Sequence, residues 1–214
     1  TDLRFLQRMA QRNGYVFYIE PVTFGMNTAY FGPENRLSLP QPALTQHMGD
    51  ATNVRRLSFS NDALAPVSTE GTILEPMSKT SIPVPSLPSL RIPPLAARPT
   101  EARRSVRLRR AAGQNPAQAA ASAVAGVSNA PDAVTGNGEL ESVRYGHVLR
   151  ARKLVGVRGV GLSYDGFYYV RRVTHNIARG SYTQSFTLSR EGTMTLVPAV
   201  SVMSVFPDAV PGGR

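Results

Sequence analysis

The fold is predicted best from the stretch Tyr164-Asp-Gly-Phe-Tyr-Tyr-Val-Arg-Arg-Val-Thr-His-Asn-Ile-Ala-Arg-Gly-Ser-Tyr-Thr-Gln-Ser-Phe-Thr-Leu-Ser-Arg-Glu-Gly192. On both sides of a short loop at residues 178–181, aromatic, β-branched and polar residues alternate in the way that buries one face of a strand. Gly180 lies in that loop and can adopt the positive φ angle of a tight turn. The pattern therefore predicts an antiparallel β-hairpin with one buried face.

Strict alternation assigns every residue of this hairpin to a face. In the first strand, one face carries Phe167, Tyr169, Arg171, Val173, His175 and Ile177, and the other carries Tyr168, Val170, Arg172, Thr174 and Asn176. In the second strand, the face predicted to be buried carries Tyr182, Gln184, Phe186 and Leu188. The opposite, polar face is a candidate lumen or interface surface and carries Ser181, Thr183, Ser185 and Thr187.

Composition limits the classes of protein to which the chain can belong. Its 214 residues suffice for one large or two small domains, and a hydrophobic content of 42% allows a core. Cysteine is absent, which excludes disulfides, thiolate metal sites and cysteine nucleophiles. No apolar run reaches the roughly 18 residues that a membrane-spanning helix needs, and the opening Thr1-Asp-Leu-Arg does not resemble a secretory signal. We therefore expect assembly in the cytoplasm and no membrane partner.

The N-terminal part of the chain predicts a helix followed by a hairpin. Thr1 is a favourable N-cap, an apolar stripe follows it, and Asn13-Gly14 is typical of a helix end. The expected elements are a helix at 1–13, strands at 15–20 and 28–31 with a turn at 21–27, an irregular proline-containing stretch at 33–50 and a strand at 53–60. Residues 1–50 are therefore predicted to form a helix-plus-hairpin subdomain.

The middle of the chain has a different composition. Residues 67–138 are rich in proline, arginine and alanine and predict a long extended insertion. Within it, the prolines of 81–90 favour a polyproline-like conformation without regular structure, whereas Pro116 and the alanines of 117–125 predict a short helix. After it, strands are expected at 144–150 and 153–159. The predicted fold class is α+β and mostly β, with a C-terminal tail at 199–214.

Six arginines lie in one short segment, offset there only by Glu101, and the rest of the chain, whose net charge is +10 in all, is only mildly basic. They are candidate partner-contact residues and comprise Arg98, Arg103, Arg104, Arg107, Arg109 and Arg110. One hypothesis is a solvated arm that keeps a long loop soluble, and the other is a basic arm that orders on an acidic partner. No aromatic residues lie among these arginines, so stacking on nucleic-acid bases is not indicated.

Motifs for catalysis and for cofactor or metal binding are not found in the sequence. The glycines of 156–161 have the wrong order for a dinucleotide-binding loop, and we interpret them as a strand that passes close to another backbone. His47, His147 and His175 are not spaced as metal ligands, and His175 is interpreted as a core or interface histidine. Asp165-Gly166 indicates a turn. We expect no enzyme activity, no cofactor and no metal.

The order of several segments resembles a known family. Residues 1–18 place Asp2 before a Phe-Leu-x-Arg helix that runs into an aromatic strand, and further similar segments lie at 55–64, 140–150, 154–159 and 164–192. Together they resemble the late control D proteins, the baseplate hubs of contractile phage tails, which are similar to the hub portion of VgrG-type spikes. Residues 67–138 are not explained by this resemblance.

The resemblance implies a structural function. Family members are homotrimers whose barrel domains form a ring that joins the tail tube protein to the spike protein, beside other baseplate proteins. The resemblance implies that 51–66 and 139–198 form the second, tube-like antiparallel hub barrel, and that the first barrel belongs before residue 1. It supplies no catalytic residues. The expected location is the tail baseplate of a virion, or an injection-system particle, assembled in the bacterial cytoplasm.

Two other functions are kept as alternatives. The arginines of 98–110 are compatible with a basic nucleic-acid-binding module, although a nucleic-acid partner is the weaker hypothesis. A cell-wall hydrolase component of the same tail would need an acidic residue such as Glu139 for general acid–base catalysis.

Overall fold

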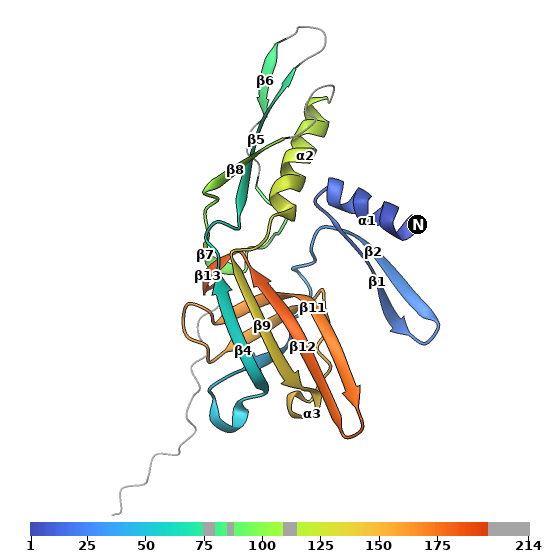
Figure 1. Ribbon diagram of the computed structural model, residues 1–214, viewed down its shortest axis with the longest axis vertical. Helices are drawn as coiled ribbons and strands as arrows, with labels where there is room; N and C mark the ends of the chain where they lie inside the picture. The colour runs from blue at the N-terminus through green and yellow to red at the C-terminus, as the bar shows by residue number, and fades with distance from the viewer. Residues whose placement is uncertain (75–79, 85–87, 109–114, 197–214) are drawn as a thin grey trace, which may run out of the picture.

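A computed structural model of the chain describes residues 1–74, 80–84, 88–108 and 115–196 (Figure 1). The predicted fold class is confirmed, because the structure is α+β and mostly β. Its largest unit is a six-stranded sheet in the order β3-β10-β11-β12-β9-β4 that curls into a half-barrel. The strands are β3 (Gln41–Thr45), β4 (Val54–Asn61), β9 (Val134–Glu141), β10 (Leu154–Arg158), β11 (Gly166–Ala178) and β12 (Ser181–Arg190). In the part of the chain that the structure describes, the sheet is open, with β3 and β4 at its edges.

The core lies on the concave side of this half-barrel. The hairpin stretch is central to the fold because it supplies much of this core. Tyr168, Val170, Phe186 and Leu188 are buried in it together with apolar side chains of β4, β9 and β10. The hairpin prediction is confirmed, because β11 pairs antiparallel with β12 from Ala178↔Ser181 to Tyr169↔Ser189. Burying these large apolar side chains is the main favourable contribution to folding.

A β-bulge at Arg171 changes the predicted faces of β11. The register passes from Val170↔Leu188 directly to Arg172↔Thr187, so Arg171 is an extra residue in its strand. Val170 and Val173 therefore contact the same core cluster, whereas strict alternation places them on opposite faces. The predicted assignment was wrong beyond residue 170, because an inserted residue reverses the alternation of all that follow it.

Two glycines of β9 make room for aromatic rings in the sheet. A Cβ atom added at Gly138 would lie 2.5 Å from Cζ of Phe186 and 2.7 Å from the Arg56 carbonyl oxygen. A Cβ atom added at Gly136 would lie 2.7 Å from Cε1 of Phe59. Glycine in a strand interior weakens a sheet unless a close approach requires it, and here the two rings occupy the space that side chains would take.

Gly138→Ala is expected to lower the free energy of unfolding by about 1–3 kcal/mol, because the added methyl group overpacks against Phe186 and a backbone oxygen that cannot easily move. Chemical denaturation measures the loss. Gly156→Ala in β10 is the matched control, since its new Cβ would meet side chains only at 3.6 Å or more. Equal stability of the two variants would contradict the packing argument.

The predicted helix and hairpin are present at the N-terminus. They are α1 (Asp2–Arg12), β1 (Val16–Thr23) and β2 (Met26–Gly32). Gly14, which follows the helix, has φ +69°, and a Cβ atom added there would lie 3.0 Å from the Cα of Ala125 and 3.0 Å from the Cβ of Ser128. The hairpin is longer than predicted, because Pro21 pairs with Asn27 inside the ladder and the turn is confined to Phe24-Gly25.

The proline-, arginine- and alanine-rich segment contains more regular structure than the sequence indicates. It forms β5 (Val67–Leu74), β6 (Ser81–Val84), β7 (Ala96–Pro99), β8 (Arg104–Arg107) and α2 (Pro116–Asn129). The helix prediction is confirmed, with Asn115 and Gln118 forming a reciprocal capping box. The expectation of no regular structure at 81–90 was wrong for 81–84, where β6 pairs with β5 around Pro83, and it is correct for 88–90. Residues 85–87 lie outside the described ranges. Residues 134–138 belong to β9 of the main sheet.

Two shorter predictions also need correction. Residues 33–50 were expected to be irregular, but β3 and a short 3-10 helix, η1 (Gly49–Ala51), form there. β3 tolerates Pro42 because it is an edge strand whose parallel pairing with β10 is irregular at that point. The prediction of a strand at 144–150 was wrong, because this stretch begins inside the short helix α3 (Ser142–Tyr145), which Gly146 ends with φ 75°. The tail at 199–214 lies outside the described residues.

Candidate functional site

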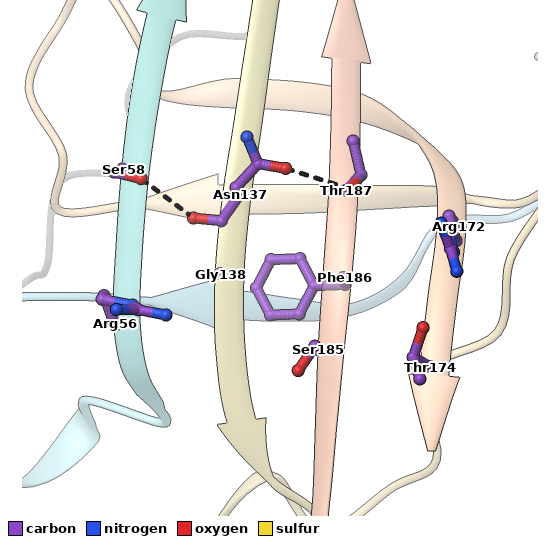
Figure 2. Close-up of a pocket in the computed structure, with 9 residues that line it drawn as sticks. All are labelled: Arg56, Ser58, Asn137, Gly138, Arg172, Thr174, Ser185, Phe186 and Thr187. Atoms are coloured by element: carbon purple, nitrogen blue, oxygen red, sulfur yellow. Dashed lines mark hydrogen bonds between the residues drawn. The ribbon is translucent and has the colours of Figure 1, made fainter. Parts of the chain in front are cut away.

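A polar groove crosses the centre of the six-stranded sheet (Figure 2). It has a volume of about 360 Å³ and is lined by Arg56, Ser58, Asn137, Gly138, Arg172, Thr174, Ser185, Phe186 and Thr187. Asn137 organises its floor, because its side-chain oxygen accepts a hydrogen bond from the Thr187 hydroxyl at 3.0 Å and its carbonyl accepts one from Ser58 at 3.3 Å. The groove presents hydroxyl, amide and guanidinium donors side by side, which suits contact with a polar or anionic surface.

The predicted polar face of β12 lies partly in this groove. Ser185 and Thr187 line it, Thr183 is buried, and Ser181 is exposed at the start of the strand. The lining contains two arginines, from β4 and β11, and no carboxylate. Glu139 is the cross-strand partner of Ser185, and its carboxylate lies 3.8 Å from Arg55. The four residues therefore do not form one uniform exposed surface, since burial differs along the strand.

The basic segment is partly built into sheets. Arg98 lies in β7, which pairs with β13 (Gly192–Thr195), and Arg104 and Arg107 lie at the ends of β8, which pairs in parallel with β5. Together with Arg103, these side chains are exposed, and within the described residues none of the four forms an ion pair. Arg109 and Arg110 lie outside the described residues. The described part of the segment is thus not a free arm, although its charges face solvent.

A buried charge cluster, which the sequence did not indicate, joins distant parts of the chain. Its members are Glu34, Arg36, Arg91, Asp132, Arg171 and Glu191. The two carboxylate oxygens of Asp132 lie 2.6 Å from Nη1 of Arg91 and 2.8 Å from Nη2 of Arg171. Arg36, whose side chain is 0% exposed, lies 2.8 Å from Glu191. The cluster connects the loops before β3, β7 and β9 to the bulge of β11.

The electrostatics of the cluster centre on Asp132. Burial by itself would raise the pKa of this carboxyl, but the positive charges of Arg91 and Arg171 and a hydrogen bond from Ser189 outweigh it and lower the pKa. Burial in turn would lower the pKa of Arg171, yet Glu34 and Asp132 raise it. The ionised forms are therefore the stable ones, as expected for a buried cluster in which each charge has an opposite neighbour.

Acid is expected to destabilise the protein through Asp132. Its folded-state pKa is below its unfolded-state value of about 3.9, so the stabilisation is fully present above that value and is lost as the pH falls through the folded-state pKa. Denaturation series between neutral pH and pH 2 should give a free energy of unfolding that declines steeply below about pH 4. Asp132→Asn should show a shallower decline, and an identical slope would contradict this role.

The remaining residues singled out in the sequence have structural contacts. Asp165 accepts a hydrogen bond from the Val160 amide at 2.9 Å and confirms the predicted turn. Gly159 passes so close to Gln46 that a Cβ atom would overlap its carbonyl oxygen, as the strand interpretation requires. His175 is exposed rather than buried in the core, and its Nδ1 lies 2.8 Å from the Tyr182 hydroxyl.

The other two histidines lie at the surface. His47 is exposed, with Nδ1 3.3 Å from the Gly159 carbonyl oxygen, and His147 is exposed beside the Tyr145 ring. Across the described ranges, no group of three histidine, aspartate or glutamate side chains is placed to bind a metal ion. None of the described helices combines the length and apolar character that crossing a membrane requires.

Solved structures of two tail proteins share this fold. The chain is similar to a tail protein from Neisseria meningitidis MC58, with 16% sequence identity and a TM-score of 0.56. It is also similar to the 43 kDa tail protein of prophage MuSo2 from Shewanella oneidensis, with 14% identity and a TM-score of 0.55. Each match covers 89% of this chain and 54% of the other, so the chain spans about half the length of these proteins. No protein-family profile and no curated protein matches the sequence.

Proposed function

We propose that the chain is a structural protein of a phage tail or a related injection particle, and that it forms part of the baseplate hub that joins the tail tube to the central spike. The observation that carries this proposal is the fold shared with two tail proteins, one of them from a prophage, over 89% of the chain. The segment order that resembles late control D proteins supports the more specific role. The function would rest on shape and symmetry rather than on chemistry.

The polar groove has a natural use in such a particle. A curved sheet in a ring needs one face for its own core and one polar face for the lumen or for a neighbouring subunit. Ser185 and Thr187 supply neutral hydroxyl groups to that face, while Arg56 and Arg172 add charge from the flanking strands. We propose that this surface faces the lumen or a neighbouring copy in a homotrimer, with the tube protein above and the spike protein below.

Imaging of purified particles from the source cell tests the proposal. Cryo-electron microscopy focused on the junction of tube and spike should reveal a three-fold ring whose density fits β11 and β12. Light scattering on the purified full chain, at increasing concentration, should reveal trimers. Absence of the chain from that ring would overturn the hub role.

Nucleic-acid binding is a second candidate, favoured by the exposed side chains of Arg98, Arg103, Arg104 and Arg107, none of which forms an ion pair with another described residue. Affinity for a DNA duplex should then fall by about 10³-fold or more between 50 and 200 mM salt if at least six phosphates are contacted. Changing Arg103, Arg104 and Arg107 to alanine should abolish binding. Salt-independent or absent binding would leave the structural role as the single proposal.

A further inference from the structure

The strand β8 is exposed along its whole length. Its four residues, Arg104, Ser105, Val106 and Arg107, are all exposed, and Val106, the one large apolar residue among them, is 44% exposed. Every other strand in the described ranges has at least one residue that is buried or half-buried. The side chains of β8 therefore contribute little burial to the fold.

The neighbouring strands are covered on a side where β8 is not. The sheet order is β6-β5-β8, so β8 is an edge strand. Helix α2 packs on β5, where the buried Thr69 hydroxyl donates a hydrogen bond to the Ala123 carbonyl at 3.2 Å. In Figure 1, β8 lies at the margin of the unit that β5, β6 and α2 form. Backbone pairing with β5, rather than burial of side chains, is thus what holds β8 in place.

The open edge of β8 carries backbone groups that a further strand could use. Leu108, directly after the strand, donates its N–H to the Glu70 carbonyl at 2.9 Å and so directs its backbone groups toward β5. Successive residues of a strand direct these groups to opposite edges. Ser105 and Arg107 therefore direct their N–H and C=O groups to the open side, where no strand of the described residues pairs with them. Such an edge is a template for the addition of one more strand.

The arginines of this segment restrict which strand can be added. Arg104 is paired with Val67 and Arg107 with Glu70, so the two guanidinium groups lie on opposite faces of the sheet. Neither of them, nor Arg103 just before the strand, forms an ion pair with a described residue. Side chains of an added strand would lie about 4.5–5.5 Å from those directly opposite, between Cβ atoms. Acidic residues at these positions would be attracted, whereas basic ones would be repelled.

We propose that the open edge of β8 binds an extended acidic segment of another protein, which adds to the sheet as a further strand. In this mode of recognition, main-chain hydrogen bonds give affinity and the alternate side chains give specificity. A second copy of β8 is a poorer occupant, because it would bring arginine beside arginine. A nucleic acid could pair with the charges, but it would form no strand ladder with Ser105 and Arg107. This inference does not depend on the hub role.

Binding of synthetic peptides to the full chain tests the proposal. Two probes of about ten residues share the same alternating threonine and valine positions and carry glutamates in one peptide and lysines in the other. A third probe has the glutamate sequence with the backbone N–H groups along its centre methylated, so that it keeps its charge but cannot add as a strand. Isothermal titration should give a Kd at least about 10-fold lower for the unmethylated glutamate peptide than for either other probe, equivalent to about 1.4 kcal/mol.

Variants of the chain separate the edge from its charges. Ser105→Pro removes an N–H from the open edge and leaves the pairing with β5, because proline is tolerated in an edge strand where the N–H faces solvent. It should weaken binding of the glutamate peptide at least about 10-fold, and so should Arg104→Gln with Arg107→Gln. Arg179→Gln, exposed in the turn between β11 and β12, is the control for a lost charge and should leave the affinity unchanged. Circular dichroism establishes that each variant remains folded.

Three results would overturn the proposal. Equal affinity for the methylated and unmethylated glutamate peptides would show that charge alone is recognised. Tighter binding of a DNA duplex than of the glutamate peptide would make a nucleic acid the occupant. Self-association of the free chain that Ser105→Pro abolishes would make a second copy the occupant. Absence from the tube–spike ring would overturn the hub role alone.

Discussion

Asp132→Asn is expected to lower the free energy of unfolding by about 3–5 kcal/mol. The side chain of Asp132 is 1% exposed, and its carboxylate lies within ion-pair distance of Arg91 and Arg171. Asparagine keeps the size of the side chain but removes the negative charge, so two guanidinium groups lose a compensating partner in a medium where water cannot replace it. Chemical denaturation followed by circular dichroism at neutral pH measures the loss.

Glu141→Gln is the matched control for this variant. Glu141 also forms an ion pair, at 3.7 Å from Arg55, but its side chain is 36% exposed and that of Arg55 is 55% exposed. Exposed pairs of this kind contribute about 0–1 kcal/mol. If Asp132→Asn lowered the free energy of unfolding as little as Glu141→Gln does, the buried cluster would not be what holds the surrounding loops to the sheet.

Phe186→Ala is expected to destabilise the protein by about 3–5 kcal/mol. The ring is 3% exposed, belongs to the main core cluster and lies over Gly138, where no side chain can fill the space that it leaves. The variant therefore loses both the transfer free energy of the ring and the contacts that surround it. Because Phe186 also lines the polar groove, the same variant should weaken any assembly that uses this groove.

Ile177→Ala is the control for the core variant. Ile177 lies in the adjoining strand β11 but is 77% exposed, so its truncation should change the free energy of unfolding by less than about 0.5 kcal/mol. Thermal and chemical denaturation of both variants give the comparison. If Phe186→Ala were as stable as Ile177→Ala, the sheet centre would have to tolerate a cavity, contrary to the close packing around Gly138.

The polar groove was predicted only in part. The hydroxyl groups of Ser185 and Thr187 follow from alternation, but their neighbours Arg56 and Arg172 do not. Arg56 comes from β4, which is distant in sequence, and the face of Arg172 depends on a bulge in β11. Arg172 lies on the polar face, opposite to the core side chain of Val170, only because of the bulge at Arg171, since strict alternation would place residues 170 and 172 on the same face. A bulge of this type leaves no clear signal in a sequence of mixed residues, since many residue types can occupy it.

By itself, the sequence determined the local elements whose signals are short-range. The alternation around Gly180 predicted the hairpin of β11 and β12, the stripe of residues 1–13 predicted α1, and Pro116 predicted the start of α2. These signals depend on side-chain periodicity and on φ preferences of neighbouring residues, which act over a few positions.

Only the tertiary structure decided which distant residues meet. It brought Glu34, Asp132 and Arg171 into one buried cluster, paired β3 with β10 and placed the basic residues of 104–107 in a sheet. Each of these charges, taken alone in the sequence, has the appearance of a solvated surface residue. Their burial is possible because opposite charges arrive together, and that compensation depends on long-range packing, which local propensity does not encode.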